Sequence, residues 1–373
     1  MEEQVNILIL EPVSDLGGVS NYILTLLIGV NKNKFKIFVG ASGNGYLFEK
    51  LRKTNLASPV SLPIDYNLYS FVKSAKELKT FCKKESIDII FANGLKAGFI
   101  STVVNIFLKK KMIYLAHGWR FSQKIFLIKK IAVYFIDIFV CYRANWIMAL
   151  SDYDVKIGKK FYLIKSDNFS IAPTCIDSVK LDNYKKIDTK EAIKIIGTIG
   201  RMVYEKNPEE FIRIASEVVS KRQDVKFIWF GGGNLENLFI EKIKEYKLQK
   251  FVFWGGSIPH DGVYNEISKF DIFILSSVID TFPISLIEAM AFGVPIVSSN
   301  VGAISSIIKQ NETGFLYKSG DVKEDANLVI NCLNMTETEK NDMIKNQNEL
   351  IYENYSPAKK LGEIYEKIWD KII

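Results

Sequence analysis

The stretch DIFILSSVIDTFPISLIEAMAFGVPIVSSN, residues 271–300, decides the fold class of this chain. Its apolar run at 271–277 predicts a buried strand, and the run at 295–300 predicts a second one. Between them, Pro283 is expected at the first position of a helix that ends at the Phe-Gly pair 292–293. The stretch therefore reads as strand, loop, helix and strand, the unit that builds parallel sheets.

The same alternation of short apolar runs and longer amphipathic stretches continues along the chain on both sides. Residues 207–222 predict a helix with Asn207 as N-cap and Pro208 at its first position. The fold class is therefore α/β, with two doubly wound, Rossmann-like domains. Ten strands are predicted, at residues 5–10, 36–41, 88–94, 111–118, 146–151, 193–201, 225–233, 251–257, 271–277 and 295–300.

Apolar periodicity is lost near residues 174–190, which marks the seam between the domains. We expect an N-terminal domain at 1–175 and a C-terminal domain at 176–355. Residues 356–373 form a separate amphipathic helix that is free to pack back on either domain.

Composition narrows the function classes. With 373 residues and 48% hydrophobic content, the chain can bury two cores. The opening MEEQVNILIL lacks the positive leader of a secretory signal, so a cytoplasmic location is expected. The cysteines show no CxxC or CxxH spacing, which predicts reduced core thiols rather than a zinc site or disulfides. They are Cys82, Cys141, Cys175 and Cys332.

Positive charge is concentrated in the first domain. Residues 1–175 hold 24 Lys and Arg against 13 Asp and Glu, whereas the remainder holds 25 against 29. Much of the excess lies at 109–165, interleaved with apolar residues such as those of 125–142, as in a helix lying on an anionic membrane. The alternative is a buried helix with a solvated basic rim. Lys129, Lys130 and Asp137 interrupt the apolar run, so it does not predict a spanning helix.

Ligands of open parallel sheets bind at the carboxyl ends of the strands, which directs attention to the strand-to-helix loops. Gly17-Gly18 would let backbone amides approach an anion at the start of a helix, although a plain tight turn fits equally. Arg201 and Lys206 lie between a strand end and a helix start, so both could bind one diphosphate. The alternative for these two is a pair of solvated loop cations.

Two acids flank the start of the helix in the opening stretch. Asp280 precedes it and Glu288 lies one turn inside, near the free amides of Ile284 and Ser285. Carboxylates in such a place can accept hydrogen bonds from the hydroxyls of a sugar or a ribose. The alternative makes Asp280 a helix cap and Glu288 a surface residue.

A second acidic pair, Asp152 and Asp154, has the D-x-D spacing of a metal motif. In the context SDYDVKIGKK it reads instead as a Ser-capped helix start with acids in the first turn.

Taken together, the motifs resemble the retaining GT-B glycosyltransferases, specifically glycosyltransferase family 4. The resemblance spans nearly the whole chain and is strongest from Ile193 to Tyr317. It implies two facing Rossmann-like domains, with the nucleotide sugar held mainly by the second, and a C-terminal helix that crosses back to pack on the first. The motifs are DLGGVS, AHG, GRMVYEKN, FGGG, FWGGSIP, SSVIDTFPISLIEAMAFGVPIVSSNVGA and TGFLY.

The resemblance also implies residue roles. Arg201 and Lys206 would bind the donor diphosphate, helped by the amides near Phe282, Ile284 and Ser285. Glu288 matches the acid that holds the ribose hydroxyls, and Asp280 stands where the family has a Glu facing the transferred sugar. His117 matches a histidine near the sugar and the departing phosphate, and Gly17-Gly18 match a loop closing over the diphosphate.

Three departures from the family pattern concern detail. Asp280 is shorter than Glu by one methylene, Asn207 follows Lys206 where Gly is common, and Thr174-Cys175 replace Asn-Gly between the domains.

The implied activity is that of a hexosyltransferase. It would move a sugar, with retention, from a nucleoside-diphosphate sugar such as a UDP-sugar to a lipid-linked or polysaccharide acceptor in bacterial surface glycan synthesis. No metal, cofactor or nucleic acid is expected to bind. The protein is expected to lie peripherally on the inner face of the membrane. Two alternatives stay open: a non-catalytic GT-B-like partner subunit and a sugar-nucleotide epimerase.

Overall fold

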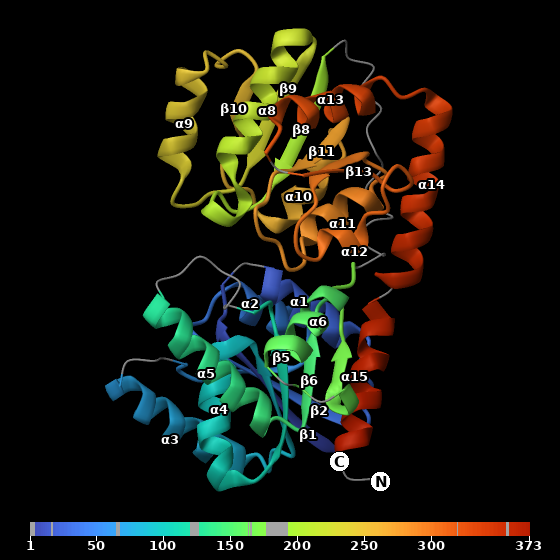
Figure 1. The fold of residues 1–373 in the computed structure, drawn as a ribbon. Helices are drawn as coiled ribbons and strands as arrows, with labels where there is room; N and C mark the ends of the chain where they lie inside the picture. Colours follow the sequence, from blue (N-terminus) through green and yellow to red (C-terminus); the bar gives the residue numbers. More distant parts are fainter. Residues whose placement is uncertain are drawn as a thin grey trace. The chain divides into compact units, whose positions relative to one another are not determined.

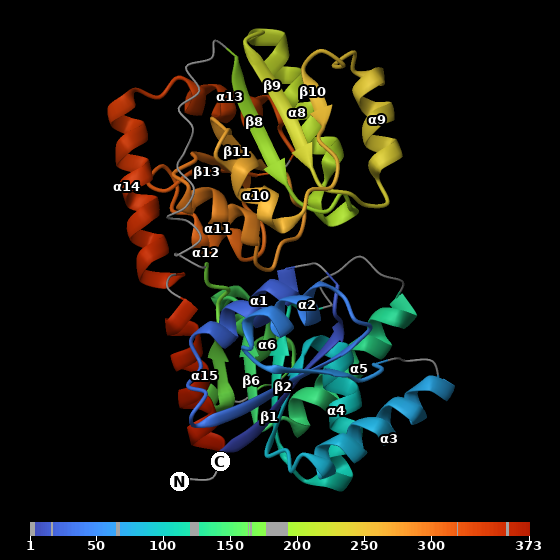
Figure 2. The ribbon, with the colours of Figure 1, turned by 180° about the vertical axis from the view of Figure 1, so that it is seen from behind.

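The computed structural model describes residues 4–15, 18–64, 68–119, 127–162, 164, 166–176, 193–318, 320–355 and 358–373. The chain divides into two units. Unit 1 is Met1–Cys175 with Pro357–Ile373, and unit 2 is Ile176–Ser356. Figures 1 and 2 show the elements of both units from opposite sides.

Unit 1 is built on a seven-stranded parallel sheet of order β3-β2-β1-β4-β5-β6-β7. Its strands are β1 (Val5–Val13), β2 (Phe35–Ser42), β3 (Ser58–Ser61), β4 (Ile89–Asn93), β5 (Lys111–Ala116), β6 (Trp146–Ala149) and β7 (Phe169–Ile171). Its helices are α1 (Gly18–Ile28), α2 (Tyr46–Thr54), α3 (Leu68–Lys84), α4 (Gly94–Leu108), α5 (Leu127–Arg143), α6 (Asp152–Phe161) and α15 (Ala358–Ile372), with a short 3-10 helix η2 (Ser166–Asn168).

Helices cover both faces of this sheet because its strands are apolar on both faces. Leu8 and Leu10 of β1 join a core with residues of α4 and α5, whereas Ile7 and Ile9 are buried on the opposite face. On one side α4 packs against α3 and α5, and on the other α1 packs against α2 and α15. The sheet is therefore enclosed, as an open parallel sheet requires.

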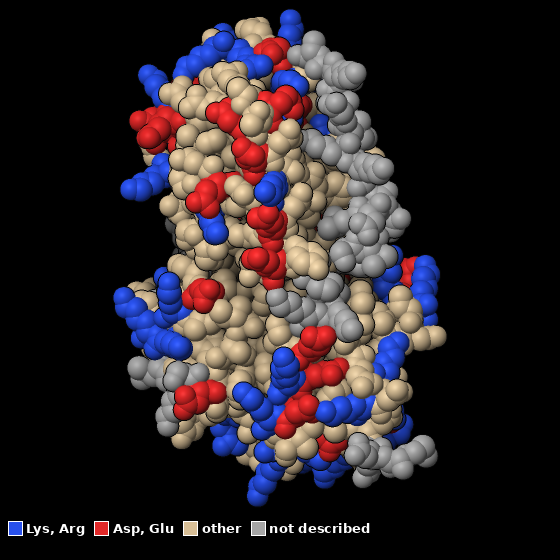
Figure 3. All heavy atoms as spheres, turned by 90° about the vertical axis from the view of Figure 1, so that its right-hand side faces the viewer, with Lys and Arg blue, Asp and Glu red and all other residues tan. Residues whose placement is uncertain are grey.

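Helix α15 is held in unit 1 by aromatic side chains. The Tyr365 hydroxyl lies 2.7 Å from the Tyr22 hydroxyl of α1, and the Trp369 ring packs edge-on to Phe35 with 4.9 Å between centroids. On the outer side of α15, Lys34 pairs with Asp370 at 2.7 Å. Figure 3 looks onto α15 and shows acidic and basic side chains interspersed there.

Unit 2 is built on a six-stranded parallel sheet of order β10-β9-β8-β11-β12-β13. Its strands are β8 (Lys194–Ile199), β9 (Val225–Phe230), β10 (Val252–Trp254), β11 (Ile272–Leu275), β12 (Ile296–Ser299) and β13 (Phe315–Tyr317). Its helices are η3 (Tyr204–Lys206), α8 (Pro208–Lys221), α9 (Glu236–Glu245), α10 (His260–Ile267), α11 (Ile284–Ala291), α12 (Ile304–Ile307), α13 (Val322–Leu333) and α14 (Glu337–Asn354).

The predicted helix at 207–222 is confirmed as α8, which opens on Pro208 and buries an apolar stripe against the sheet. Asn207 occupies the N-cap position, as predicted. Its backbone is left-handed, with φ 50°, and its side chain makes no capping hydrogen bond. The cap at Ser151 is confirmed: the Ser151 hydroxyl accepts from the Asp154 amide at 3.2 Å, so the D-x-D spacing marks the first turn of α6.

All ten predicted strands are present, and three further strands were not predicted. These are β3, β7 and β13, which have four, three and three residues. Each lies at an edge of its sheet, where a short strand needs little apolar sequence. Part of the predicted seam, residues 177–190, lies outside the described residues.

Two buried acids face each other between helices of unit 2. Glu210 of α8 and Asp325 of α13 are both buried, and Arg213 lies 3.7 Å from Glu210. Burial and then the neighbouring Glu210 carboxylate raise the pKa of Asp325 to about 7, and burial raises the pKa of Glu210. The folded state therefore holds a proton on Asp325 that the unfolded chain releases near its ordinary value of 3.8.

This difference in proton binding predicts that stability is lost as pH rises from about 4 through about 7. Asp325→Asn should remove the loss, so the variant should gain on the order of 1 kcal/mol over wild type at about pH 8 and little at about pH 5. Thermal unfolding followed by circular dichroism at both values measures the difference. Glu241→Gln, an exposed change on α9, is the control, and an equal shift of Asp325→Asn at both pH values would contradict the prediction.

Candidate active site

The strand order of unit 2 reverses beside β8, with β9 on one side and β11 on the other. At such a reversal the connections leave in opposite directions, and this is where open parallel sheets bind ligands. Arg201 follows β8, Lys206 ends η3, and Asp280 lies in the loop after β11. The predicted residues of this unit therefore gather at one edge of the sheet.

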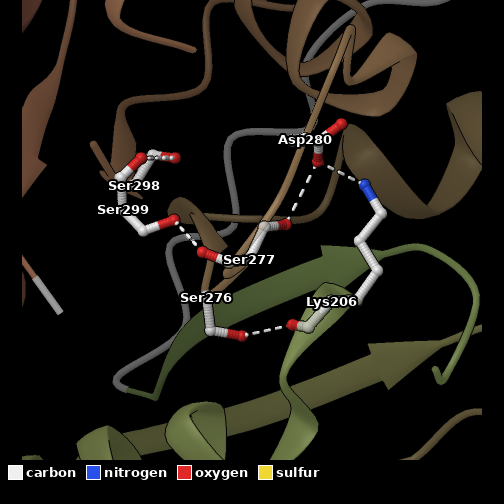
Figure 4. Close-up of polar contacts among 6 residues, drawn as sticks. All are labelled: Lys206, Ser276, Ser277, Asp280, Ser298 and Ser299. Carbon is white, nitrogen blue, oxygen red and sulfur yellow. Dashed lines mark hydrogen bonds and ion pairs between the residues drawn. The ribbon is translucent and has the colours of Figure 1, made fainter. Parts of the chain in front are cut away.

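Lys206 and Asp280 form an ion pair at this edge (Figure 4). The Lys206 Nζ lies 2.5 Å from the Asp280 Oδ2, and the Ser277 hydroxyl donates to the same oxygen at 3.1 Å. Asp280 is only 8% exposed. The sequence did not predict this pair, because the two residues are 74 positions apart and each was assigned to a different part of the ligand.

Hydrogen bonds to backbone carbonyls hold the two loops together. The Val278 amide donates to the Glu205 carbonyl at 2.9 Å, and the Ser276 hydroxyl reaches the carbonyls of Lys206 and Asn207 at 3.0 Å. The Asp280 carbonyl in turn accepts from the Ala303 amide at 3.0 Å. The positions of the cation and the acid are therefore fixed by the chain itself rather than by the ion pair alone.

Helix α11 begins one residue later than predicted. Pro283 was expected at its first position, but it is the N-cap with an extended backbone, φ −78° and ψ 99°. The ring of proline fixes φ and leaves ψ free, so the sequence could not separate the two positions. The Leu286 and Ile287 amides donate to the Pro283 carbonyl, and within the described residues the amides of Ile284 and Ser285 have no acceptor.

The remaining predicted residues in and just before α11 are buried. Glu288 is 5% exposed, so its reading as a surface helix residue is wrong. Phe282 is buried with its ring edge-on to Tyr355, 5.8 Å between centroids. Asp280 accepts from Lys206 and Ser277, so the structure does not support its reading as a cap.

Glycines bring the neighbouring loops close to Arg201. A Cβ on Gly231 would lie 2.1 Å from the Gly200 carbonyl oxygen, and one on Gly233 would lie 2.2 Å from that of Met202. Arg201 itself is exposed, and no acid in the described part of the chain pairs with it. One exposed cation, one half-buried cation and two free amides can hold an anion, while the buried carboxylates can accept from hydroxyls.

Unit 1 has the same kind of reversal between β1 and β4. Gly18 is the first residue of α1, after β1, whereas Gly17 lies outside the described residues. His117 follows β5, next but one to β1 in the sheet. Burial lowers the pKa of His117 to about 4, so the imidazole is neutral at neutral pH.

Two residues beside His117 were missed by the sequence reasoning. The Asn93 carboxamide contacts His117 Nε2 through its Oδ1 and donates through Nδ2 to Glu11 at 2.7 Å. Asn93 is the last residue of β4, and Glu11 lies two residues before the end of the neighbouring strand β1. Polar residues near the carboxyl ends of adjacent apolar strands indicate a ligand site, and this pattern could have identified Glu11 and Asn93 from the sequence.

No group of His, Cys, Asp or Glu suited to hold a metal ion occurs among the residues that the structure describes.

Comparison with known proteins follows the division into units. The family described as Glycosyltransferase Family 4 matches residues 16–180, and the family described as Glycosyl transferases group 1 matches residues 180–350. The chain belongs to the GT-B glycosyltransferases. The predicted GT-B glycosyltransferase family is thereby confirmed.

Two relatives match this glycosyltransferase over most of their length. The UDP-Gal:alpha-D-GlcNAc-diphosphoundecaprenol alpha-1,3-galactosyltransferase of Escherichia coli is 24% identical over 324 residues, 82% of this chain and 81% of that one. The O-antigen biosynthesis glycosyltransferase WbnH of Escherichia coli is 23% identical over 355 residues, 93% and 96% of the two chains.

Solved structures share the fold of this glycosyltransferase. Anabaena HepE in complex with UDP superposes with a TM-score of 0.81 at 16% identity, covering 98% of this chain and 100% of that one. Sucrose-phosphate synthase of Thermosynechococcus elongatus gives 0.82 at 15% identity, covering 99% and 100%. The GT-B fold class predicted from the sequence is therefore confirmed.

The loop carrying Asp280 rests against Gly302, which predicts a specific sensitivity there. Gly302 has φ +55°, and a Cβ would lie 1.8 Å from the Asp280 carbonyl oxygen. Gly302→Ala should displace the loop, cost about 1–3 kcal/mol of stability and lower turnover. Gly256→Ala is the matched control, because Gly256 has φ +75° but open space around its Cβ position. Denaturant unfolding and activity assays compare them, and equal effects of both variants would show that φ strain alone matters.

Proposed function

We propose that this glycosyltransferase is a retaining enzyme that transfers a hexose from a UDP-sugar to a lipid-linked or polysaccharide acceptor in bacterial surface glycan synthesis. The observation that carries the proposal is the fixed pair of Lys206 and Asp280 beside the free amides of α11. That arrangement offers positive charge for a diphosphate and a carboxylate for sugar hydroxyls within one loop pair.

The named relatives support the choice of donor and acceptor. One Escherichia coli relative is named for a UDP-galactose donor and a diphosphoundecaprenol acceptor, and another for O-antigen biosynthesis. Among the solved structures that share the fold, HepE was obtained with UDP and with UDP-glucose.

We assign the residues of unit 2 by their chemistry. Arg201 and Lys206 would neutralise the charge that grows on the diphosphate as the sugar–phosphate bond breaks, aided by the amides of Ile284 and Ser285 next to Phe282. Glu288 would accept from the ribose hydroxyls. Asp280 would accept from the transferred sugar.

In unit 1, His117 would meet the sugar, and Gly17-Gly18 would close over the diphosphate. We expect no metal, since side chains and helix amides supply the positive charge in this scheme. Transfer on one face of the sugar, with retained configuration, is the expected course. Glu11, an acid in the same row as His117, is 4% exposed and bonded to Asn93, which disfavours it as a covalent nucleophile.

Two alternatives keep the same fold. A non-catalytic partner subunit would bind UDP without transferring sugar, and a sugar-nucleotide epimerase would change the sugar without an acceptor. Incubation with a panel of nucleotide sugars, with and without lipid-linked acceptors, separates the three. Acceptor-dependent release of UDP supports the transferase, and a changed nucleotide sugar supports the epimerase. If neither product forms, the result supports the non-catalytic subunit.

A membrane-facing surface is a further part of the proposal. Helix α5 is anchored by its inner face, where buried Asp137 accepts from the Tyr114 hydroxyl at 3.0 Å. Its outer face presents an apolar stripe at helical spacing, with Ile128 84%, Phe135 63% and Tyr142 86% exposed. Ile131 and Phe139 continue the stripe.

Basic residues lie on the same helix as this stripe and next to a neighbouring helix. Lys129, Lys130 and Arg143 lie on α5 itself, and the run Lys109–Lys111 follows the neighbouring α4. No helix in the described ranges has both the length and the apolar content that crossing a bilayer requires. An exposed apolar stripe with a basic rim fits the headgroup region of an anionic membrane, which would bring the enzyme to lipid-linked acceptors on the inner face.

The donor assignment predicts different effects of three substitutions on UDP affinity and on sugar transfer. Lys206→Ala should weaken UDP binding by about 1.5–3 kcal/mol, because one charged phosphate contact is lost. Glu288→Gln should also weaken UDP, whereas Asp280→Asn should leave UDP affinity nearly intact and reduce sugar transfer. Isothermal titration with UDP and turnover with the sugar nucleotide measure both quantities.

One control separates phosphate binding from damage to the buried pair. Lys206→Ala leaves the Asp280 carboxylate buried without its cation, and the double variant Lys206→Ala/Asp280→Asn does not. Weak UDP binding in both supports a direct phosphate contact. Wild-type UDP affinity in the double variant would dismiss it, and wild-type transfer by Asp280→Asn would dismiss the sugar contact.

The membrane surface predicts capture by anionic vesicles that weakens as salt rises, since charge is screened over about 10 Å at 0.1 M. Phe135→Asn and Tyr142→Asn should reduce flotation at any salt concentration, and Lys129→Glu/Lys130→Glu should abolish the salt dependence. Tyr352→Asn is the matched control, because Tyr352 is 76% exposed on α14 of unit 2. Equal flotation with neutral vesicles, or none at low salt, would contradict this surface.

A further inference from the structure

Three polar side chains form a hydrogen-bonded row across adjacent strand ends in unit 1. Strand β4 lies between β1 and β5, and the register pairs Leu10 with Ala92 and Asn93 with Leu115. Glu11 and Asn93 are therefore neighbours, and His117 follows two residues after Leu115. The β1–β2 register shifts between Glu11 and Val13, a bulge of the kind that re-aims side chains beside active sites.

The chemistry of the row fixes the direction of each hydrogen bond. Asn93 Nδ2 lies 2.7 Å from Glu11 Oε2, and an amide nitrogen can only donate. Burial raises the pKa of Glu11 to about 8, and the Glu11 carboxyl has an oxygen that can accept from Nδ2 in both its protonated and its ionised form. The Asn93 Oδ1 is then turned to His117 Nε2, which must carry the hydrogen. His117 Nδ1 keeps a lone pair, and it has no hydrogen-bond partner among the described residues.

Asn93 gives up a local role to take this position. It is the N-cap of α4, where asparagine ordinarily bonds the first turn, yet its side chain makes no capping bond. It is also 1% exposed and Glu11 is 4% exposed. The hydrogen bonds to Glu11 and His117, rather than capping of α4, therefore set the conformation of the Asn93 side chain.

We propose that Glu11 and Asn93 are positioning residues that hold His117 as the neutral imidazole protonated on Nε2, so that Nδ1 acts as a hydrogen-bond acceptor for a substrate hydroxyl. The tautomer follows from the row alone. The hydroxyl contact rests on the proposed function, in which His117 meets the sugar.

The surroundings of His117 agree with an acceptor role. Burial keeps its pKa low, so it offers no charge to a departing phosphate at neutral pH. The Tyr22 ring lies edge-on to the imidazole with 5.8 Å between centroids. The Tyr22 hydroxyl is engaged elsewhere, with the Ala172 carbonyl at 3.0 Å and Tyr365 at 2.7 Å.

The chain suits a direct test of the tautomer, because it holds only two histidines, His117 and His260. In the His260→Gln background, ¹⁵N-labelled histidine gives the imidazole signals of His117 alone. We expect one tautomer, protonated on Nε2, without any substrate present. A mixture of tautomers, or a proton on Nδ1, would overturn the proposal whether or not the protein transfers sugar.

Two changes at Glu11 test its role as the hydrogen-bond acceptor of Asn93. Glu11→Gln keeps a side-chain carbonyl that can accept from Asn93 Nδ2, so the tautomer should stay as in wild type. Glu11→Leu removes the acceptor, so the Asn93 amide can turn and present Nδ2 to His117, which should shift the proton to Nδ1. An unchanged tautomer in a folded Glu11→Leu protein would overturn the positioning role.

Turnover supplies the second readout. Glu11→Leu and Asn93→Ala should lower kcat about 10–100-fold, as losses of supporting hydrogen bonds and small misplacements do, with the donor KM little changed. Glu11→Gln should retain most of the activity. Loss in both Glu11 variants alike, or activity retained by Glu11→Leu despite a shifted proton, would show that the row only fills the core. Absence of transfer by the wild type would instead count against the proposed function.

Discussion

The structure depends on one constraint of parallel sheets, namely that a reversal of strand order leaves two neighbouring strand ends without a shared connection. Both units have one reversal, between β1 and β4 and between β8 and β11. At each, polar groups that would be costly elsewhere in the core find partners across the gap. Glu11 and Asn93 do so in unit 1, and Lys206 and Asp280 in unit 2. The candidate site is thus built where the topology leaves room for it.

Much of the fold was predictable because buried parallel strands leave a plain record in the sequence. Runs such as VNILIL and DIFILSS are apolar on both faces, and Pro208 and the Phe-Gly pair at 292–293 mark helix ends that the structure confirms to within a residue or two. The short edge strands β3, β7 and β13 were not predicted from the sequence. They have only three or four residues, partly buried, which is too few to show a periodic apolar pattern.

The candidate site was predictable as a set of residues but not as a set of contacts. Arg201, Lys206 and Asp280 stood out by residue type and position, yet only tertiary structure shows Lys206 paired with Asp280. Glu11 follows the predicted strand 5–10 and Asn93 lies inside the predicted strand 88–94, and neither was singled out, because their partnership depends on the register of β1 against β4. In α5, likewise, the sequence shows amphipathic spacing but cannot say that Asp137 faces inward and Phe135 outward.

The position of helix α15 at the end of the chain affects the order in which the two units can fold. Unit 1 is discontinuous, because α15 follows all of unit 2 along the chain yet packs on α1. During synthesis unit 2 can therefore fold before α15 has left the ribosome. Until then, the side chains that Tyr365 and Trp369 cover stay exposed, namely Tyr22, Phe35 and Phe91. The nascent first unit spends that interval with aromatic surface uncovered, which makes it a natural client for a chaperone until the last turns of α15 emerge.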